Sequence, residues 1–232
     1  MSAPPKADEN KQVKSKERIQ KHGEVFTPQW VVNDMLNLLP ADVWQPGKTF
    51  LEPACGEGAF LVEIYKRKLQ IIIAETQNEW EWQAAIATSS IYGIELLEDN
   101  TKQCKKNLKQ VFREFYRLHY PDTQNEEVKK AIHCLIKHNI VQGNALTCRK
   151  CTIACGNKCS TCEKITFSEW TPLENYQFKR QDYTYEGVLK INKFRETSIG
   201  KTVFESITWR NILIKILNRL KKAVYLQKAK RF

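Results

Sequence analysis

The fold is decided by the stretch Leu51-Glu52-Pro53-Ala54-Cys55-Gly56-Glu57-Gly58-Ala59-Phe60-Leu61. Its pattern is a short strand that ends in an acidic residue and turns through two glycines into a helix. Glycine lets such a turn adopt positive φ and approach a ligand closely, and the helix presents unpaired N–H groups and a partial positive charge. The turn has a single Gly-x-Gly and carries an acid, so it fits an amine- and sulfonium-bearing ligand better than a pyrophosphate. A tight strand-to-helix turn without a ligand gives the same pattern.

Around this stretch, apolar patterns predict strands and helices in alternation. Residues 69–90 interrupt the order and indicate an insertion or an extra helix. Strand, helix, strand, helix, strand is the order of a parallel sheet in an α/β fold. The expected strands are 49–52, 91–95 and 139–142, and the expected helices begin near Phe60 and then cover 98–118 and 125–137.

Two more polar positions lie at the ends of predicted strands. Glu95 ends the stretch Ile91-Tyr92-Gly93-Ile94-Glu95, where an acid can accept hydrogen bonds from two ribose hydroxyls. A solvated carboxylate at a strand end is common, but its place after the glycine turn in one βαβ unit favours the ligand role. Asn144 follows the third predicted strand and can recognise an adenine amino group, although an ordinary turn looks the same.

These stretches resemble, in order, the motifs of the adenine-N6 DNA methyltransferases of restriction–modification systems. LEPACGEGAFL resembles their first cofactor motif, IYGIELLEDN the acidic motif after it, and IVQGNAL the third. Residues 22–28, His-Gly-Glu-Val-Phe-Thr-Pro, resemble the motif that these enzymes place ahead of the first. The resemblance covers residues 22–146. It implies a Rossmann-like α/β methyltransferase fold with a partial parallel sheet, S-adenosylmethionine (SAM) as methyl donor, and DNA as partner.

Carried over by position, the resemblance assigns a role to each matching residue. Phe26, Thr27 and Pro28 would lie along the methionine end of SAM, and Glu52 would face its amino acid moiety, with the backbone of residues 54–58 around it. Glu95 would hold the ribose, Leu96 would flank the adenine, and Asn144 would contact the adenine amino group. The family usually has Asp at the last position, and Asn accepts the same hydrogen bond but lacks the charge. The expected cofactor-binding residues are Phe26, Thr27, Pro28, Glu52, Pro53, Ala54, Cys55, Gly56, Gly58, Glu95, Leu96, Asn144 and Ala145.

The catalytic motif of the family, Asn/Asp-Pro-Pro-Tyr/Phe, does not occur in the sequence, whose one Pro-Pro is Pro4-Pro5. In this motif the Asn or Asp side chain and a Pro carbonyl accept hydrogen bonds from the target amine, and the aromatic ring stacks on the flipped base. The sequence therefore predicts no catalytic residue and no methylation by this chain alone. A split enzyme, a truncated methyltransferase and a protein recruited for binding only are the three explanations. The patterned region after Leu146 favours a split enzyme whose partner subunit carries the motif.

A cysteine-rich segment stands where the catalytic loop is expected, with the spacing Cys148-x2-Cys151-x3-Cys155-x3-Cys159-x2-Cys162. Two Cys-x-x-Cys pairs in a cytosolic protein indicate a tetrahedral zinc site. The favoured ligands are Cys148, Cys151, Cys159 and Cys162. An iron–sulfur cluster fits the spacing less well, and a loop of free thiols is the remaining alternative.

The charge is strongly positive, with 37 Lys and Arg residues against 26 Asp and Glu residues, which favours a polyanionic partner such as DNA. The longest apolar runs, such as Ile71–Ala74, are too short to cross a bilayer, and the N-terminus has no secretory signal, so a cytoplasmic location is expected. The predicted organisation is a disordered basic arm at 1–20, a SAM-binding domain at 21–147, the possible zinc knuckle at 148–164, and a strand and basic-helix extension at 165–232.

The sequence leaves two rival functions open. One is a complete methyltransferase with an unrecognised catalytic loop that acts on DNA, RNA or protein. The other is a non-catalytic, zinc-dependent DNA-binding or subunit-interaction protein derived from a methyltransferase.

Overall fold

The computed structural model describes residues 16–22, 24–75, 79–121, 125–151, 161–174 and 176–189. The chain divides into two compact units, Met1–Val43 and Trp44–Phe232. The FTP motif at residues 26–28 therefore belongs to the first unit and the glycine turn to the second. The predicted basic helix near the C-terminus lies outside the described residues. In the part that is described, no helix is both long enough and apolar enough to cross a membrane.

The first unit contains two short helices, α1 (Lys16–His22) and α2 (Gln29–Asn37). Helix α1 overlaps the end of the arm that the sequence predicts to be disordered. Its residues, KERIQKH, include strong helix formers, and Arg18 pairs with Glu24 just beyond the helix (Nη2–Oε1 2.7 Å). Pro28 is the N-cap of α2, and its carbonyl accepts the N–H of Val32 at 3.1 Å.

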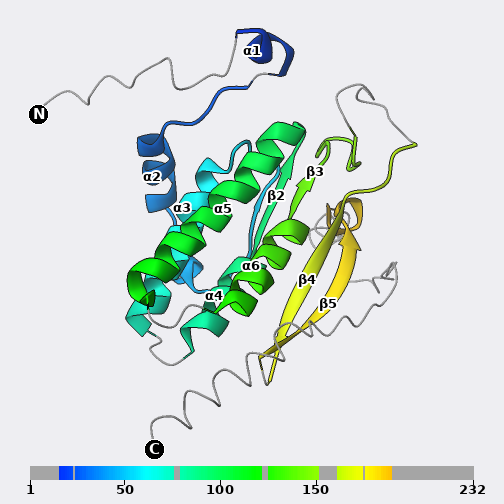
Figure 1. Cartoon of the computed structure of the whole chain (residues 1–232). Helices are drawn as coiled ribbons and strands as arrows, with labels where there is room; N and C mark the ends of the chain where they lie inside the picture. Colours follow the sequence, from blue (N-terminus) through cyan, green and yellow to red (C-terminus); the bar gives the residue numbers. More distant parts are fainter. Residues whose placement is uncertain are drawn as a thin grey trace, which may run out of the picture. The chain divides into compact units, whose positions relative to one another are not determined.

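The second unit is built on a three-stranded sheet, as the sequence predicts (Figure 1). Strands β1 (Phe50–Glu52), β2 (Ile91–Glu95) and β3 (Ile140–Gln142) lie in that order and are all parallel. The turn η2 (Ala41–Trp44) lies at the boundary between the units. Because the strands are parallel, the segments that follow them emerge at one edge of the sheet.

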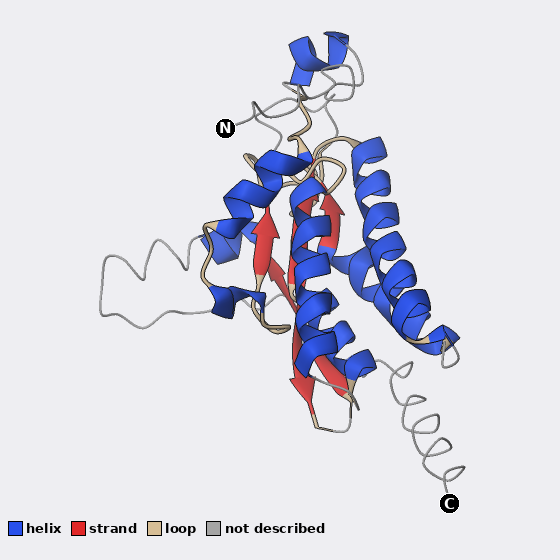
Figure 2. Ribbon diagram, turned by 90° about the vertical axis from the view of Figure 1, so that its left-hand side faces the viewer, coloured by secondary structure: helices blue, strands red, loops and turns tan. Residues whose placement is uncertain are grey.

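Helices connect these strands and cover the sheet (Figure 2). Helices α3 (Ala59–Glu75) and α4 (Trp80–Ser89) join β1 to β2, and α5 (Glu98–His119) and α6 (Glu126–Asn139) join β2 to β3. Residues 69–90, predicted as an insertion or an extra helix, are the end of α3 and the whole of α4. Trp80 and Trp82 are buried, so α4 is part of the core.

A hairpin of β4 (Thr166–Leu173) and β5 (Gln177–Thr184) packs against the same unit. The Tyr92 hydroxyl of β2 donates to the Ser168 carbonyl at 3.0 Å, and the Trp170 indole donates to Asn139 Oδ1 at 2.8 Å. Next to the hairpin, an apolar cluster beside β2 is formed by Ile94, Ile165, Phe167 and Tyr185. The described part of the predicted C-terminal extension therefore shares a core with the sheet.

Candidate cofactor site

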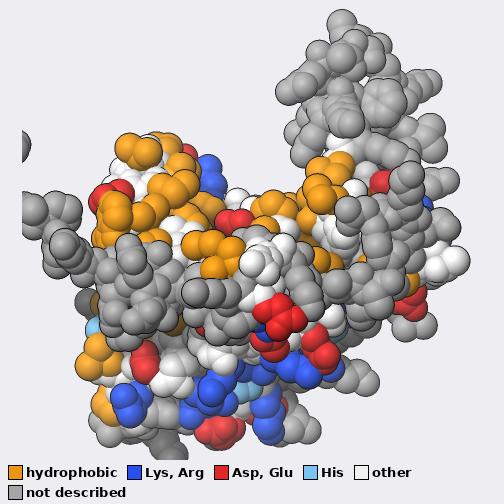
Figure 3. All heavy atoms as spheres, turned by 90° about the horizontal axis from the view of Figure 1, so that it is seen from above, with side chains coloured by type: hydrophobic (Ala, Val, Ile, Leu, Met, Phe, Trp, Pro, Cys, Tyr) orange, Lys and Arg blue, Asp and Glu red, His pale blue; other side chains and the backbone are white. Residues whose placement is uncertain are grey.

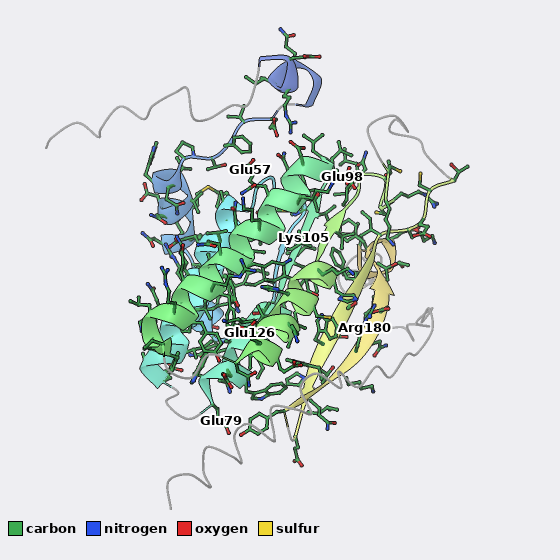
Figure 4. All side chains as sticks on the ribbon, in the orientation of Figure 1. Glu57, Glu79, Glu98, Lys105, Glu126 and Arg180 are labelled. Carbon is green, nitrogen blue, oxygen red and sulfur yellow. The ribbon has the colours of Figure 1, made fainter. Side chains whose placement is uncertain are left out.

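The glycine turn has the backbone that its sequence predicts. Gly56 and Gly58 have φ of 52° and 90°, values that L side chains rarely adopt. The Cys55 N–H donates to the Ile94 carbonyl at 2.9 Å, and the Gly58 N–H to the Cys55 carbonyl at 2.7 Å. Glu57 of this turn and Glu98, the first residue of α5, lie at the same end of the domain in Figure 4.

Helix α5 supports the turn from a position that the sequence analysis missed. A Cβ atom on Gly58 would lie 2.7 Å from Cys104 Sγ, so only glycine fits against α5 there. Asn107, one helical turn later, donates from Nδ2 to the Glu57 carbonyl at 2.9 Å. No local signal marks Cys104 or Asn107, because both contacts join residues far apart in the chain.

Glu95 lies at the carboxyl end of β2, only 8% exposed, and its two oxygens accept different backbone N–H groups. Oε2 accepts from Gly56 at 2.9 Å and Oε1 from Leu97 at 2.8 Å. A carboxylate has about four lone-pair positions, so these two bonds leave acceptor capacity for two hydroxyl groups. The structure thus brings the first two predicted motifs together at one carboxylate.

Glu52 ends the neighbouring strand β1, at the same edge of the sheet. Burial raises the pKa of Glu52 above its ordinary value, and a hydrogen bond with the Ala54 backbone opposes the rise. The two strand ends therefore place two acidic side chains beside the glycine turn. Among the flanking residues, Pro53 and Ala54 are exposed and Cys55 is buried.

The third motif joins the same edge through β3. Gly143 donates its N–H to the Glu95 carbonyl at 2.9 Å, and Gln142 Nε2 contacts the Leu96 carbonyl at 3.4 Å. Asn144 Oδ1 accepts the N–H groups of Leu146 at 2.9 Å and Thr147 at 3.4 Å. The oxygen assigned to adenine recognition therefore already caps its own turn, and Ala145 packs beside the apolar cluster.

The structure shows less about the remaining predicted site residues, which are the FTP motif and the cysteines. Phe26, Thr27 and Pro28 are half-buried in the first unit, and their contact with SAM stays a prediction. Cys151 is buried, Cys148 packs against the apolar cluster, and Cys162 accepts a hydrogen bond from Arg149 through its carbonyl at 2.8 Å. Within the described ranges, no group of three or more His, Cys, Asp or Glu side chains is arranged to hold a metal. Cys155 and Cys159 lie outside these ranges, so the zinc site stays a prediction.

The family model described as MmeI, DNA-methyltransferase domain, matches residues 40–194, more than half of the chain. No curated protein and no solved structure matches this chain. The matched range includes the glycine turn, Glu95, the third motif and the hairpin.

Proposed function

Since this chain belongs to the family of MmeI DNA-methyltransferase domains, we propose that it is the SAM-binding part of a DNA adenine-N6 methyltransferase whose catalytic loop comes from a partner chain. The family agrees with the sequence resemblance to restriction–modification methyltransferases. SAM supplies an activated methyl group on its sulfonium. The residues of this chain bind and orient that donor.

The bond between Glu95 and Gly56 is the observation that carries the cofactor role. It fixes the acid of β2 against the backbone of the glycine turn, so ribose and amino acid binding positions form one continuous surface. The remaining lone pairs of Glu95 accept the two ribose hydroxyls, and Glu52 faces the α-ammonium group. The first turn of α3, a helix of 17 residues, presents N–H groups to the carboxylate of SAM.

Two observations support a partner chain. The sequence has no Asn/Asp-Pro-Pro-Tyr/Phe motif to hold a flipped adenine. Among the residues that the structure describes, β1 pairs with β2 alone, and Leu51 of β1 is 41% exposed. A further strand from a partner can pair with the free edge of β1 and cover Leu51.

The test of the cofactor role is calorimetric titration of SAM into the full chain. We expect binding that Glu95→Ala weakens about tenfold or more, since about 1.4 kcal/mol of lost hydrogen bonding has that effect. Glu98→Gln is the matched control, because it removes an exposed carboxylate only three residues away. If the chain binds DNA but no SAM, the proposal fails and the non-catalytic, DNA-binding alternative gains support.

The partner role is tested by transfer of a labelled methyl group from SAM to duplex DNA. We expect no transfer by this chain alone, and transfer to adenine N6 when a polypeptide with the Asn-Pro-Pro-Tyr motif is added. Transfer by the isolated chain would contradict the need for a partner, and labelling of cytosine would contradict the adenine specificity.

A further inference from the structure

Helix α5 carries a regular row of cations that the cofactor site does not use. Lys105, Lys109, Arg113 and Arg117 are spaced four apart, so they follow one face of the helix. The neighbouring helix α6 contributes Lys130, His133 and Lys137 at spacings of three and four. We name these seven residues the α5–α6 seam. The spacing was visible in the sequence, but the packing of the two rows side by side was not.

Two hollows lie along the seam. One, of about 390 Å³, is lined by residues of α5 and α6 that include Arg113, Arg117, Lys130 and His133. The other, of about 540 Å³, extends from Lys105 and Lys137 to the hairpin residue Arg180. Figure 4 labels Lys105 on α5, Glu126 on α6 and Arg180 on the hairpin, which together span this side of the unit. Figure 3 shows Lys and Arg side chains (blue), with some Asp and Glu (red) among them and a histidine (pale blue), along its lower margin, the side that faces the viewer in Figure 1.

The positive charge of the seam is only partly neutralised. Within the seam, Lys130 pairs with Glu127 at 3.0 Å, and the adjacent Lys129, which is not part of the seam, pairs with Glu126 at 2.8 Å. Across the described part of the chain, no carboxylate lies within ion-pair distance of the other five seam cations, Lys105, Lys109, Arg113, Arg117 and Lys137. Burial lowers the pKa of Lys105, and the nearby ammonium groups of Lys109 and Lys137 lower it further. Glu114 and Glu126 also line the first hollow, but the Lys and Arg residues there outnumber them, and this excess of positive charge favours an external anion.

His133 adds an unsatisfied polar atom to the seam. Its Nε2 is buried and has no hydrogen-bond partner within the described residues. Burial and the charges of Lys109 and Arg113 lower the pKa of His133, which favours its neutral form. An anion in the first hollow, which His133 lines, would reduce the repulsion among the seam cations and bring acceptor oxygens close to them.

We propose that the α5–α6 seam binds the phosphate backbone of duplex DNA. The twelve residue steps from Lys105 to Arg117 span about 18 Å at about 1.5 Å per step, which is about five phosphates of one strand at about 3.4 Å each along the DNA axis. The seam runs along the outer helices, whereas the cofactor site lies at the carboxyl ends of the strands. Because phosphate contacts carry no sequence information, the seam anchors the DNA without reading its sequence. The inference rests on the proposed function for the choice of DNA as the polyanion.

The experiment compares two variants of the full chain that each lose three positive charges. The seam variant combines Lys109→Gln, Arg113→Gln and Lys137→Gln. The control variant combines Lys66→Gln, Lys102→Gln and Lys164→Gln, which are exposed cations outside the seam. Binding of fluorescent duplex DNA is measured by anisotropy over a series of salt concentrations, and SAM binding is measured by calorimetry on the same proteins.

We expect the seam variant to lose about tenfold or more in DNA affinity, and the slope of log affinity against log salt to become shallower by about 2.7, since each lost phosphate contact accounts for about 0.9. The control variant should retain nearly the wild-type slope. Equal slopes for the two variants would overturn the proposal, because they would indicate a general effect of net charge. Competition by polyglutamate as strong as that by unlabelled DNA would also overturn it and would indicate an acidic protein partner.

The SAM titration separates this inference from the proposed function. Unchanged SAM binding by the seam variant, together with weak DNA binding, supports both. Seam-dependent DNA binding by a chain that does not bind SAM would support the seam and contradict the cofactor role.

Discussion

Glu95 Oε2 accepts a hydrogen bond from the Gly56 N–H at 2.9 Å, although 39 residues separate the two in the chain. The same carboxylate accepts the Leu97 N–H through its other oxygen at 2.8 Å. The acid of β2 thus holds the glycine turn and the start of α5 at once. Because the side chain is buried, these bonds act in a low-dielectric environment where an unmade bond is costly.

Replacing Glu95 with Gln is therefore expected to destabilise the fold as well as to weaken SAM binding. The amide oxygen of Gln can accept one of the two N–H groups, but its NH2 group then faces the other donor. The expected cost is about 1–3 kcal/mol, measured as the free energy of unfolding in urea. Glu98→Gln should leave the unfolding midpoint nearly unchanged, and equal midpoints for the two variants would show that the Glu95 bonds contribute little.

The packing of Gly58 against Cys104 predicts a coupled pair of variants. Gly58→Ala places a Cβ 2.7 Å from Cys104 Sγ at a φ of 90°, and the expected cost is about 2–4 kcal/mol from overpacking and backbone strain. Adding Cys104→Ala removes the sulfur and should recover part of that loss, while the cost of the positive φ stays. Urea unfolding of the four proteins of this cycle measures the coupling, and strictly additive effects would rule out the steric explanation.

The raised pKa of Glu52 predicts that SAM binding depends on pH. In the proposed role, the carboxylate attracts the α-ammonium group of SAM only while it is charged, and burial makes it take up a proton at a higher pH than an exposed Glu does. Affinity should therefore fall as the pH is lowered from neutral toward the raised pKa. Calorimetry over a series of pH values measures this fall, and Glu52→Gln should bind more weakly with a flatter profile.

Protonation of Glu52 does not lower SAM affinity by unfolding the protein. A carboxyl group whose folded pKa is raised binds more protons in the folded state, so its protonation stabilises the fold as the pH falls through that pKa. Glu98→Gln, which removes an exposed carboxylate, serves as the control. A wild-type affinity that stays constant with pH would remove Glu52 from the ammonium site.

Lys68 of α3 holds the loop that enters β1. Its side chain is fully buried, and Nζ donates to the carbonyls of Gln45 at 2.9 Å, Pro46 at 3.0 Å and Lys48 at 2.6 Å. Lys68→Met retains most of the packing but leaves these carbonyls without their donor, at an expected cost of about 2–4 kcal/mol in urea unfolding. The loop lies at the opposite ends of the strands from the cofactor site, so SAM affinity of the folded variant should not change. A tenfold loss of SAM affinity would contradict this separation.

Most of the sheet and its helices could be predicted from local pattern. The strand predicted at 91–95 is β2 with the same bounds, and the helix predicted at 98–118 is α5, one residue longer. These segments are regular because their apolar residues recur at the spacing of one face. For the hairpin, the sequence predicted a strand within residues 165–232 without bounds, and the structure has the two strands β4 and β5 there. Its position depends on Trp170 reaching Asn139 across the fold.

The sequence by itself determined the succession of strands and helices along the chain, the two positive-φ glycines and the acid at the end of β2, because each follows from neighbouring residues. Only the tertiary structure decided that Glu95 bonds to Gly56, that Cys104 lies against Gly58, and that the cations of α5 and α6 form one seam. Each of these joins residues from different parts of the chain. Such distances are set by how helices pack on the sheet, and a pattern along the chain does not encode them locally.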